Sequence, residues 1–206
     1  MEKALSQVGE QVEVRAVEMT DAPALHALDY SFETDRIYTL HQQGYLAQGD
    51  GQAKIPGKPA LAFELCETPV DLPLYKDLRV YQRTLEAVEV RLASVHGGYV
   101  ALADGQIAGV ILLKVEEWRS LARIEDIIVG RLFRRYGIGS LLLNCAADWA
   151  RNRGCRAILL ETQNVNYPAI QFYLRNGLEV WSISQHHYPP GPVEHEVAIF
   201  MGKMLR

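Results

Sequence analysis

The segment IEDIIVGRLFRRYGIGS, residues 124 to 140, decides the fold, because an apolar run leads through an arginine- and glycine-rich turn into a helix. Ile124 to Val129 predicts a strand, and the apolar positions of the next segment predict a helix with one continuous buried stripe. Those positions are Ile138, Leu141, Leu142, Cys145, Ala146 and Trp149. Gly154 fits a C-terminal cap, and Ala157 to Leu160 predicts a second buried strand. The result is a β-α-β unit.

The segments before this unit predict further strands and helices. Residues 12 to 17 alternate like a strand, and Thr20 and Asp21 are candidate caps for a short helix through Leu28. Residues 42 to 59 are rich in Gly, Gln and Lys and predict a loop. Residues 81 to 95 have apolar side chains at helical spacing, although Val88, Val90 and Leu92 also alternate as in a strand; we favour the helix.

A hairpin is predicted where the apolar runs Tyr99 to Ala103 and Ile107 to Val115 meet at Asp104-Gly105, because this pair tolerates positive φ. After the β-α-β unit, Asn166, Pro168 and Gly177 mark the start and end of a shorter helix.

Two last strands, 178 to 184 and 196 to 201, complete a fold of the α/β (α+β) class. We expect a flexible N-terminal tail over 1–11 and a single domain over 12–206, built on a mixed, mostly antiparallel central sheet with helices on both faces.

Composition restricts the classes of function. The 206 residues are 49% hydrophobic and 22% charged, with a net charge of −4, which gives no field to attract nucleic acid or an anionic membrane. No apolar run is long enough to span a bilayer, and the N-terminus lacks a secretory signal, so we expect a cytoplasmic protein. Cys66, Cys145 and Cys155 have no metal-site spacing and are interpreted as buried free thiols; no metal is expected.

The turn between strand and helix has the chemistry of an anion site. Amide groups at a helix start lack intrahelical acceptors, and the helix dipole adds partial positive charge there. Gly137 and Gly139 let the backbone approach a phosphate closely, while Arg134 and Arg135 are candidates for charge-assisted bonds. A glycine pair alone is equally typical of a tight turn, and neither a P-loop nor a full Rossmann glycine triplet is present.

Two motifs in order resemble the GNAT superfamily of N-acetyltransferases. The first is Arg134-x-x-Gly137-x-Gly139 after the strand, although Arg135 and Tyr136 depart from the usual residues. The second consists of Asn166, Ala169, Phe172, Tyr173 and Gly177, with Leu178 replacing the usual Phe. The resemblance implies acetyl-coenzyme A as co-substrate. The residues it implies for the coenzyme are Ile127, Ile128, Val129, Arg134, Arg135, Tyr136, Gly137, Ile138, Gly139, Ser140, Asn166 and Tyr173.

Acyl transfer to an amine needs a base, because freeing the lone pair of an aliphatic ammonium at pH 7 costs about 4 to 5 kcal/mol. Glu125, Asp126 and Glu161 lie near the strand ends that should separate around the thioester. On a regular strand only one of Glu125 and Asp126 faces the substrate, and we favour Glu125. Glu161 is either a base or a strand-end carboxylate bonded to nearby amides. The resemblance assigns to Tyr173 the donation of a proton to the departing thiolate.

Within the superfamily the chain looks most like the streptothricin acetyltransferases, which acetylate the β-lysine amine of that antibiotic. The resembling segments are residues 124–127, 133–134, 137–140, 160–163, 166, 172–173, 177 and 196–200. The expected acceptor is therefore an amine of a small cationic molecule, with Glu33, Glu67 and Asp126 as substrate-binding candidates. A protein or peptide N-acetyltransferase and a non-catalytic acyl-CoA sensor stay open as alternatives, as does a homodimer.

Overall fold

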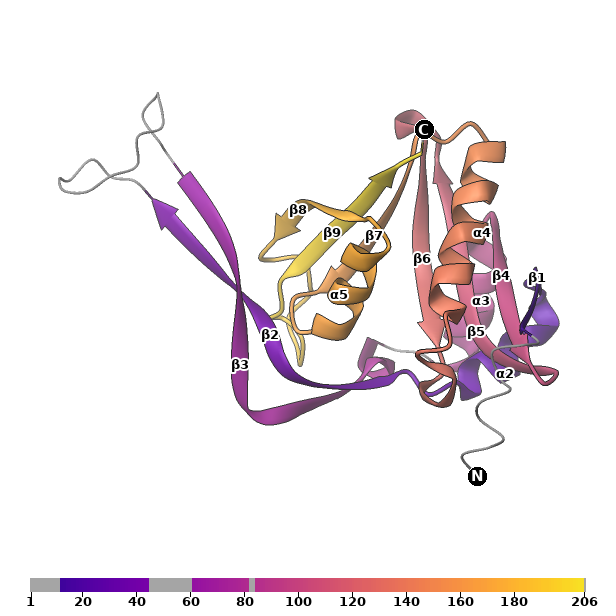
Figure 1. Ribbon diagram of the computed structural model, residues 1–206, viewed down its shortest axis with the longest axis horizontal. Coiled ribbons are helices and arrows are strands. Elements are labelled where there is room, and N and C mark those ends of the chain that lie inside the picture. Colours follow the sequence, from indigo (N-terminus) through magenta and orange to yellow (C-terminus); the bar gives the residue numbers. More distant parts are fainter. Residues whose placement is uncertain (1–11, 45–60, 82–83, 206) are drawn as a thin grey trace.

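The computed structural model describes residues 12–44, 61–81 and 84–205, and its centre is a seven-stranded sheet (Figure 1). The strands lie in the order β1 (Val12–Ala16), β4 (Gly97–Ala103), β5 (Gln106–Glu116), β6 (Leu121–Val129), β7 (Ala157–Gln163), β9 (Ala198–Met204) and β8 (Glu179–Ser184). Only β6 and β7 pair in parallel. The predicted mixed, mostly antiparallel sheet is confirmed.

Helices cover both faces of this sheet, as predicted. Residues of α4 (Ile138–Asn152) and α5 (Tyr167–Arg175) share one apolar cluster with the sheet, and residues of α2 (Ala22–Ala27) and α3 (Leu85–Ser94) share a second cluster. Short 3-10 turns lie at Met19–Asp21, Leu78–Tyr81, Glu117–Arg119 and Arg131–Phe133. No helix among the described residues is long and apolar enough to cross a membrane.

Several local predictions are confirmed. Asp104 and Gly105 both have positive φ, 50° and 73°, at the β4–β5 turn, and the segment with two interpretations forms helix α3. Asp21 differs from its expected role, because its carboxylate makes no side-chain capping bond to α2. Instead it accepts hydrogen bonds from the Arg15 guanidinium (2.7 and 2.8 Å) and from the Glu18 amide (2.8 Å).

The predicted buried stripe of α4 is partly wrong. Leu141 is exposed and Cys145 is half-buried, whereas Leu143 and Ala150 are buried although they were not in the predicted stripe. The helix thus turns a slightly different face to the sheet. The expectation of buried thiols holds for Cys155 alone, since Cys66 is also half-buried.

Sequence analysis missed a second sheet, formed by β2 (Ser31–Gly44) and β3 (Leu61–Asp77). These two long antiparallel strands extend away from the central sheet (Figure 1). Residues 42–44, predicted as part of a loop, belong to β2, and residues 45–60 lie outside the described residues. This second sheet is attached to the rest of the protein through Tyr38 and Asn164. The Tyr38 amide donates to the Asn164 carbonyl (3.0 Å), and the Asn164 side chain donates to the Tyr38 carbonyl (2.7 Å).

Candidate active site

The site begins where β6 and β7 separate. Their parallel pairing is limited to three positions, from Leu121↔Ala157 to Arg123↔Leu159, although both strands continue beyond them. Past Arg123, β6 keeps its pairing with β5 on one side only, so its other edge leaves backbone amide and carbonyl groups unpaired by β7. An opening of this kind, with free backbone groups on one wall, can hold an extended chain that carries amides.

The helix that starts beside this opening supplies further donors. Gly137 precedes α4 with φ of +80°, a left-handed conformation that strains other residues, and Arg135 also has a positive φ of 70°. The first hydrogen bond of α4 runs from the Leu141 amide to the Gly137 carbonyl. The amides of Ile138 through Ser140 precede it and have no acceptor within the helix. Glycine at position 139 is also required by packing, because a Cβ there would lie 2.8 Å from Cζ of Phe172. This glycine therefore lets α5 pack closely against α4.

Arg134 has a different environment from the one predicted. Its guanidinium is half-buried and donates to three backbone carbonyls, those of Val129 (2.9 Å), Ser31 (2.6 Å) and Asp29 (3.2 Å). Burial lowers the pKa of Arg134, and the charge of Asp29 opposes that shift. The side chain connects the end of β6 to the start of β2 and so fixes the turn, whereas the neighbouring Arg135 is exposed.

The other predicted coenzyme residues, on β6 and before α5, lie in different surroundings. Ile127 and Val129 pack half-buried against the cluster under α4, and Ile128 is buried on the opposite face of the sheet. Asn166 precedes α5 and is buried without a side-chain capping bond. Its neighbour Asn164, which sequence analysis did not select, orders this corner through its bonds to Tyr38 and to the Val197 amide (2.8 Å).

Tyr173, the predicted proton donor, is buried on α5. Its pKa is raised first by burial and then by the charges of Glu161 on β7 and Asp126 on β6. These two carboxylates belong to the two strands that separate, so the phenol lies in the field of both walls. A phenol with a raised pKa stays protonated at neutral pH and can donate a hydrogen bond.

Glu125 and Asp126 do not follow the alternation of a regular strand. The register between β5 and β6 shifts at this point, where Leu112 pairs with Asp126 and Leu113 with Ile124. Both carboxylates consequently reach Arg91 of α3, Glu125 at 3.8 Å and Asp126 at 3.3 Å. The bulge thus turns both side chains towards Arg91, whereas a regular strand would direct them to opposite faces; the choice of Glu125 for the substrate side stays a prediction.

Glu161 has a neighbour that sequence analysis missed. The Tyr188 hydroxyl, from the connection between β8 and β9, donates to Oε1 of Glu161 in a short contact. Lys76 of β3 forms a buried ion pair with Glu196 close by, and the charge of Glu161 also acts on Lys76. No Lys or Arg lies within ion-pair distance of Glu161 in the part of the chain that the structure describes.

The remaining substrate candidates are engaged elsewhere. Glu67 accepts hydrogen bonds from Tyr38 (3.2 Å), Tyr167 (3.1 Å) and Gln171 (3.3 Å), and it lies 3.7 Å from Arg36. This network joins β3 to β2 and α5. Glu33 is mostly exposed, 3.9 Å from Arg131. Within the described residues, no group of three or more His, Cys, Asp or Glu side chains could hold a metal ion.

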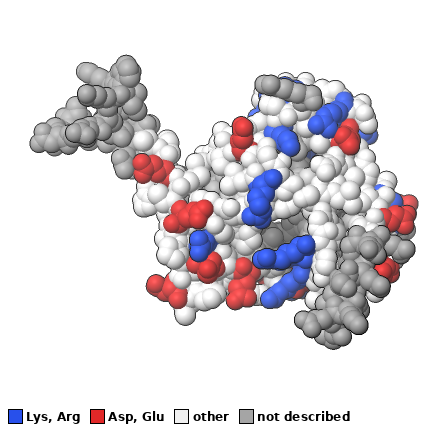
Figure 2. All heavy atoms as spheres, in the orientation of Figure 1, with Lys and Arg blue, Asp and Glu red and all other residues white. Residues whose placement is uncertain are grey.

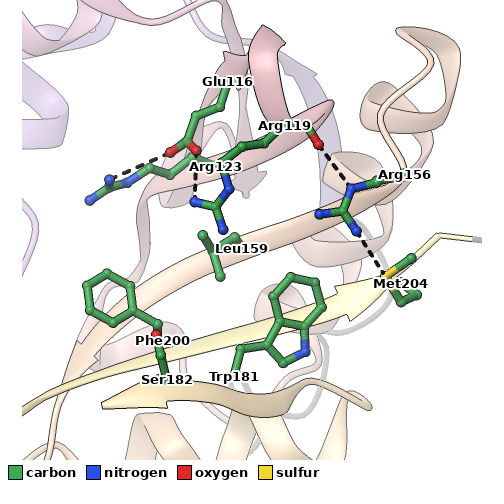
Figure 3. A pocket seen from close by; sticks show the side chains of 9 residues that line it. All are labelled: Glu116, Arg119, Arg123, Arg156, Leu159, Trp181, Ser182, Phe200 and Met204. Atoms are coloured by element: carbon green, nitrogen blue, oxygen red, sulfur yellow. Dashed lines mark hydrogen bonds and ion pairs between the residues drawn. The ribbon is translucent and has the colours of Figure 1, made fainter. Parts of the chain in front are cut away.

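A cavity of about 740 Å³ lies on the sheet face formed by β5 to β9 (Figure 3). Arg119, Arg123 and Arg156 line it beside Trp181 and Phe200, with Glu116 as its carboxylate. A groove with three guanidinium groups disfavours a cationic acceptor. The face drawn in Figure 2 has Lys and Arg beside a central hollow, and Asp and Glu mainly towards the side of β2 and β3.

Comparisons with known proteins agree with this geometry. The acetyltransferase (GNAT) family matches residues 64–178. A streptothricin acetyltransferase from Streptomyces lavendulae is 32% identical over 195 residues, which cover 94% of this chain and 95% of the relative. A crystal structure of nourseothricin acetyltransferase superposes with a TM-score of 0.76 at 30% identity and covers 95% of this chain and 99% of that one.

A second solved structure bears on the coenzyme. It is a Bacillus anthracis str. Ames protein, assigned as a streptothricin acetyltransferase and crystallised with acetyl coenzyme A. It has a TM-score of 0.69 and 25% identity, and the match covers 96% of this chain and 99% of that one.

Proposed function

We propose that this protein acetylates a primary amine of a small cationic molecule. The premise is that the chain belongs to the acetyltransferase (GNAT) family and is an acetyl-CoA-dependent N-acetyltransferase. The candidate acceptor is the β-lysine amine of streptothricin. Relatives that match nearly the whole chain support this acceptor class. The observation that carries the proposed chemistry is the buried Tyr173 phenol, which lies in the electrostatic field of Glu161 on β7 and Asp126 on β6.

The residues present suit the coenzyme. The free edge of β6 offers backbone groups to the amide-bearing arm, and the first turn of α4 directs amides towards the position of the pyrophosphate. Gly137 leaves the approach open, since a Cβ there would meet no atom within 4 Å. Acetyl-CoA supplies the thioester, and the chain's contribution is to hold it in the opening with the reactive carbonyl towards the acceptor side.

Glu161 is the proposed base. Arg91 lies beside both Glu125 and Asp126, so these two carboxylates are already paired with a guanidinium. Glu161 instead accepts a hydrogen bond from the neutral Tyr188 hydroxyl and has no Lys or Arg within ion-pair distance among the described residues, so its charge is left to attract the ammonium of the acceptor. Loss of a proton from that ammonium, directly or through water, leaves the amine nucleophilic for direct attack on the thioester carbonyl.

Tyr173 is the proposed donor to the leaving sulfur. The C–S bond breaks as the amine adds, and negative charge develops on the sulfur. The phenol is protonated and already buried, so it can stabilise this charge and return the proton to the thiolate.

The test is to incubate the purified protein with acetyl-CoA and streptothricin and to follow thiol release and the acetylated product by mass spectrometry. Peptides with free N-termini and with lysine serve as competing acceptors. Turnover with streptothricin alone supports the proposal. Acetylation of the peptides alone would assign the chain to the protein N-acetyltransferases. Coenzyme binding without turnover of any acceptor would indicate a non-catalytic acyl-CoA sensor.

A further inference from the structure

The connection between β8 and β9 places a phenol directly on the proposed base. The hydroxyl of Tyr188 donates to Oε1 of Glu161. Among the described residues no other hydrogen bond or ion pair to Glu161 is found, so its Oε2 has no partner there and can accept a hydrogen bond from the substrate amine. A carboxylate with one oxygen fixed by a neutral donor has a defined orientation and keeps its charge.

Tyr188 is suited to donate a hydrogen bond to Glu161 and not to take up a proton from it. Its side chain is half-buried, and its pKa is raised first by burial and then by the charge of Glu161 and their hydrogen bond. A hydrogen bond with Gln163 opposes that shift, and the charge of Glu196 adds to it. The phenol therefore stays protonated at neutral pH and donates to the carboxylate.

The chain around Tyr188 is anchored on both sides. The His187 ring packs edge-on against Phe200 of β9, with centroids 5.3 Å apart. Glu196, at the other end of the connection, is buried and paired with Lys76 of β3. These contacts tie the connection to two separate sheets, so the position of Tyr188 depends on the body of the protein and not on the loop alone.

We infer that Tyr188 is a positioning residue for acetyl transfer: its hydroxyl fixes Oε1 of Glu161 and so presents Oε2 to the acceptor amine. This inference rests on the proposed role of Glu161. The amine proton goes to Oε2, and Tyr188 keeps its own proton, so no bond to the phenol forms or breaks. Tyr188 of the connection contacts Glu161 directly, and the charge of Glu161 also acts on Lys76 of β3 and on Tyr173 of α5.

A double-mutant cycle with Tyr188→Phe and Glu161→Gln tests the inference, with kcat/KM for the acceptor as the readout. Removing a hydrogen bond to a charged group should lower kcat/KM about ten- to a hundredfold in the wild-type background. In the Glu161→Gln background the same change should cost less than about threefold, because the carboxylate that Tyr188 orients is gone. The Kd for acetyl-CoA, measured by calorimetry, should be unchanged in all four proteins.

Tyr99→Phe is the matched control, since it removes one hydroxyl from a half-buried tyrosine of β4, outside the site. It should keep wild-type kcat/KM and Tm. An unchanged kcat/KM in Tyr188→Phe, or equal losses in both backgrounds, would overturn the positioning role while leaving acetyl transfer intact. Full activity of Glu161→Gln would instead refute the proposed base, and absence of turnover in the wild type would refute the proposed function.

Discussion

Arg134 belongs to the coenzyme motif, yet in this structure its side chain is bonded to the protein itself. Replacing it with Met keeps most of the aliphatic stem and removes the donors to the carbonyls of Val129, Ser31 and Asp29. A hydrogen bond from a charged donor contributes about 1.5 to 3 kcal/mol, and three bonds from one half-buried side chain add incompletely. We therefore expect Arg134→Met to lower the free energy of unfolding by about 2 to 4 kcal/mol.

At about 2 to 4 °C per kcal/mol for a chain of this size, Tm without ligand should fall by about 5 to 15 °C. The assay is calorimetric unfolding of the free protein, followed by titration with acetyl-CoA well below the Tm of the variant. Arg135→Met is the control, because Arg135 is exposed in the same turn, and its Tm should stay within 1–2 °C of wild type, about half a kcal/mol. A variant at position 134 with wild-type Tm but a tenfold weaker Kd for acetyl-CoA would show that the guanidinium binds phosphate and would refute this reasoning.

Three further outcomes are expected. Tyr173→Phe should lower kcat about 10²- to 10⁴-fold with an unchanged Kd for acetyl-CoA, measured by steady-state kinetics and calorimetry; equal activity would exclude Tyr173 as the donor. Gly139→Ala should cost about 1 to 3 kcal/mol in urea unfolding, since its Cβ would press on Phe172, and no loss would mean that the ring moves freely. Asp21→Asn should destabilise by about 1 to 2 kcal/mol at pH 7. The Arg15 hydrogen bond holds the pKa of Asp21 below its usual value, so this difference should shrink as pH falls below about 4; a constant difference would contradict it.

Sequence analysis succeeded where local chemistry determines the structure. The Asp104-Gly105 turn needs positive φ at two adjacent positions, and few residue pairs other than this one tolerate that conformation. The strand, turn and helix of residues 121 to 152 likewise follow from apolar spacing and one glycine, and this segment carries the proposed coenzyme site.

The β2–β3 sheet was missed for a physical reason. Its strands extend from the body and pair with each other, so much of their length has no buried face, and Phe63 and Leu72 are largely exposed. Without one buried and one exposed face, a strand loses the alternation by which it is detected in a sequence. The buried stripe of α4 was predicted slightly out of position because burial depends on packing against the rest of the protein. Only that packing decides whether Leu141 or Leu143 points inward.

The ranking of the three acidic candidates could not come from the sequence either. Glu125 and Asp126 differ from Glu161 chiefly in their cations. Arg123, beside Glu125, is two residues away on the same strand, but the cation that both carboxylates share, Arg91, lies on a helix more than thirty residues earlier in the chain. The phenol that Glu161 accepts from lies 27 residues later. A base must be charged enough to attract an ammonium and yet able to take its proton, so the identity of its neighbours decides its role. Glu125 and Asp126 are paired with guanidinium groups and Glu161 with a neutral hydroxyl, and this difference in partners is the ground for proposing the base on β7 and not on β6.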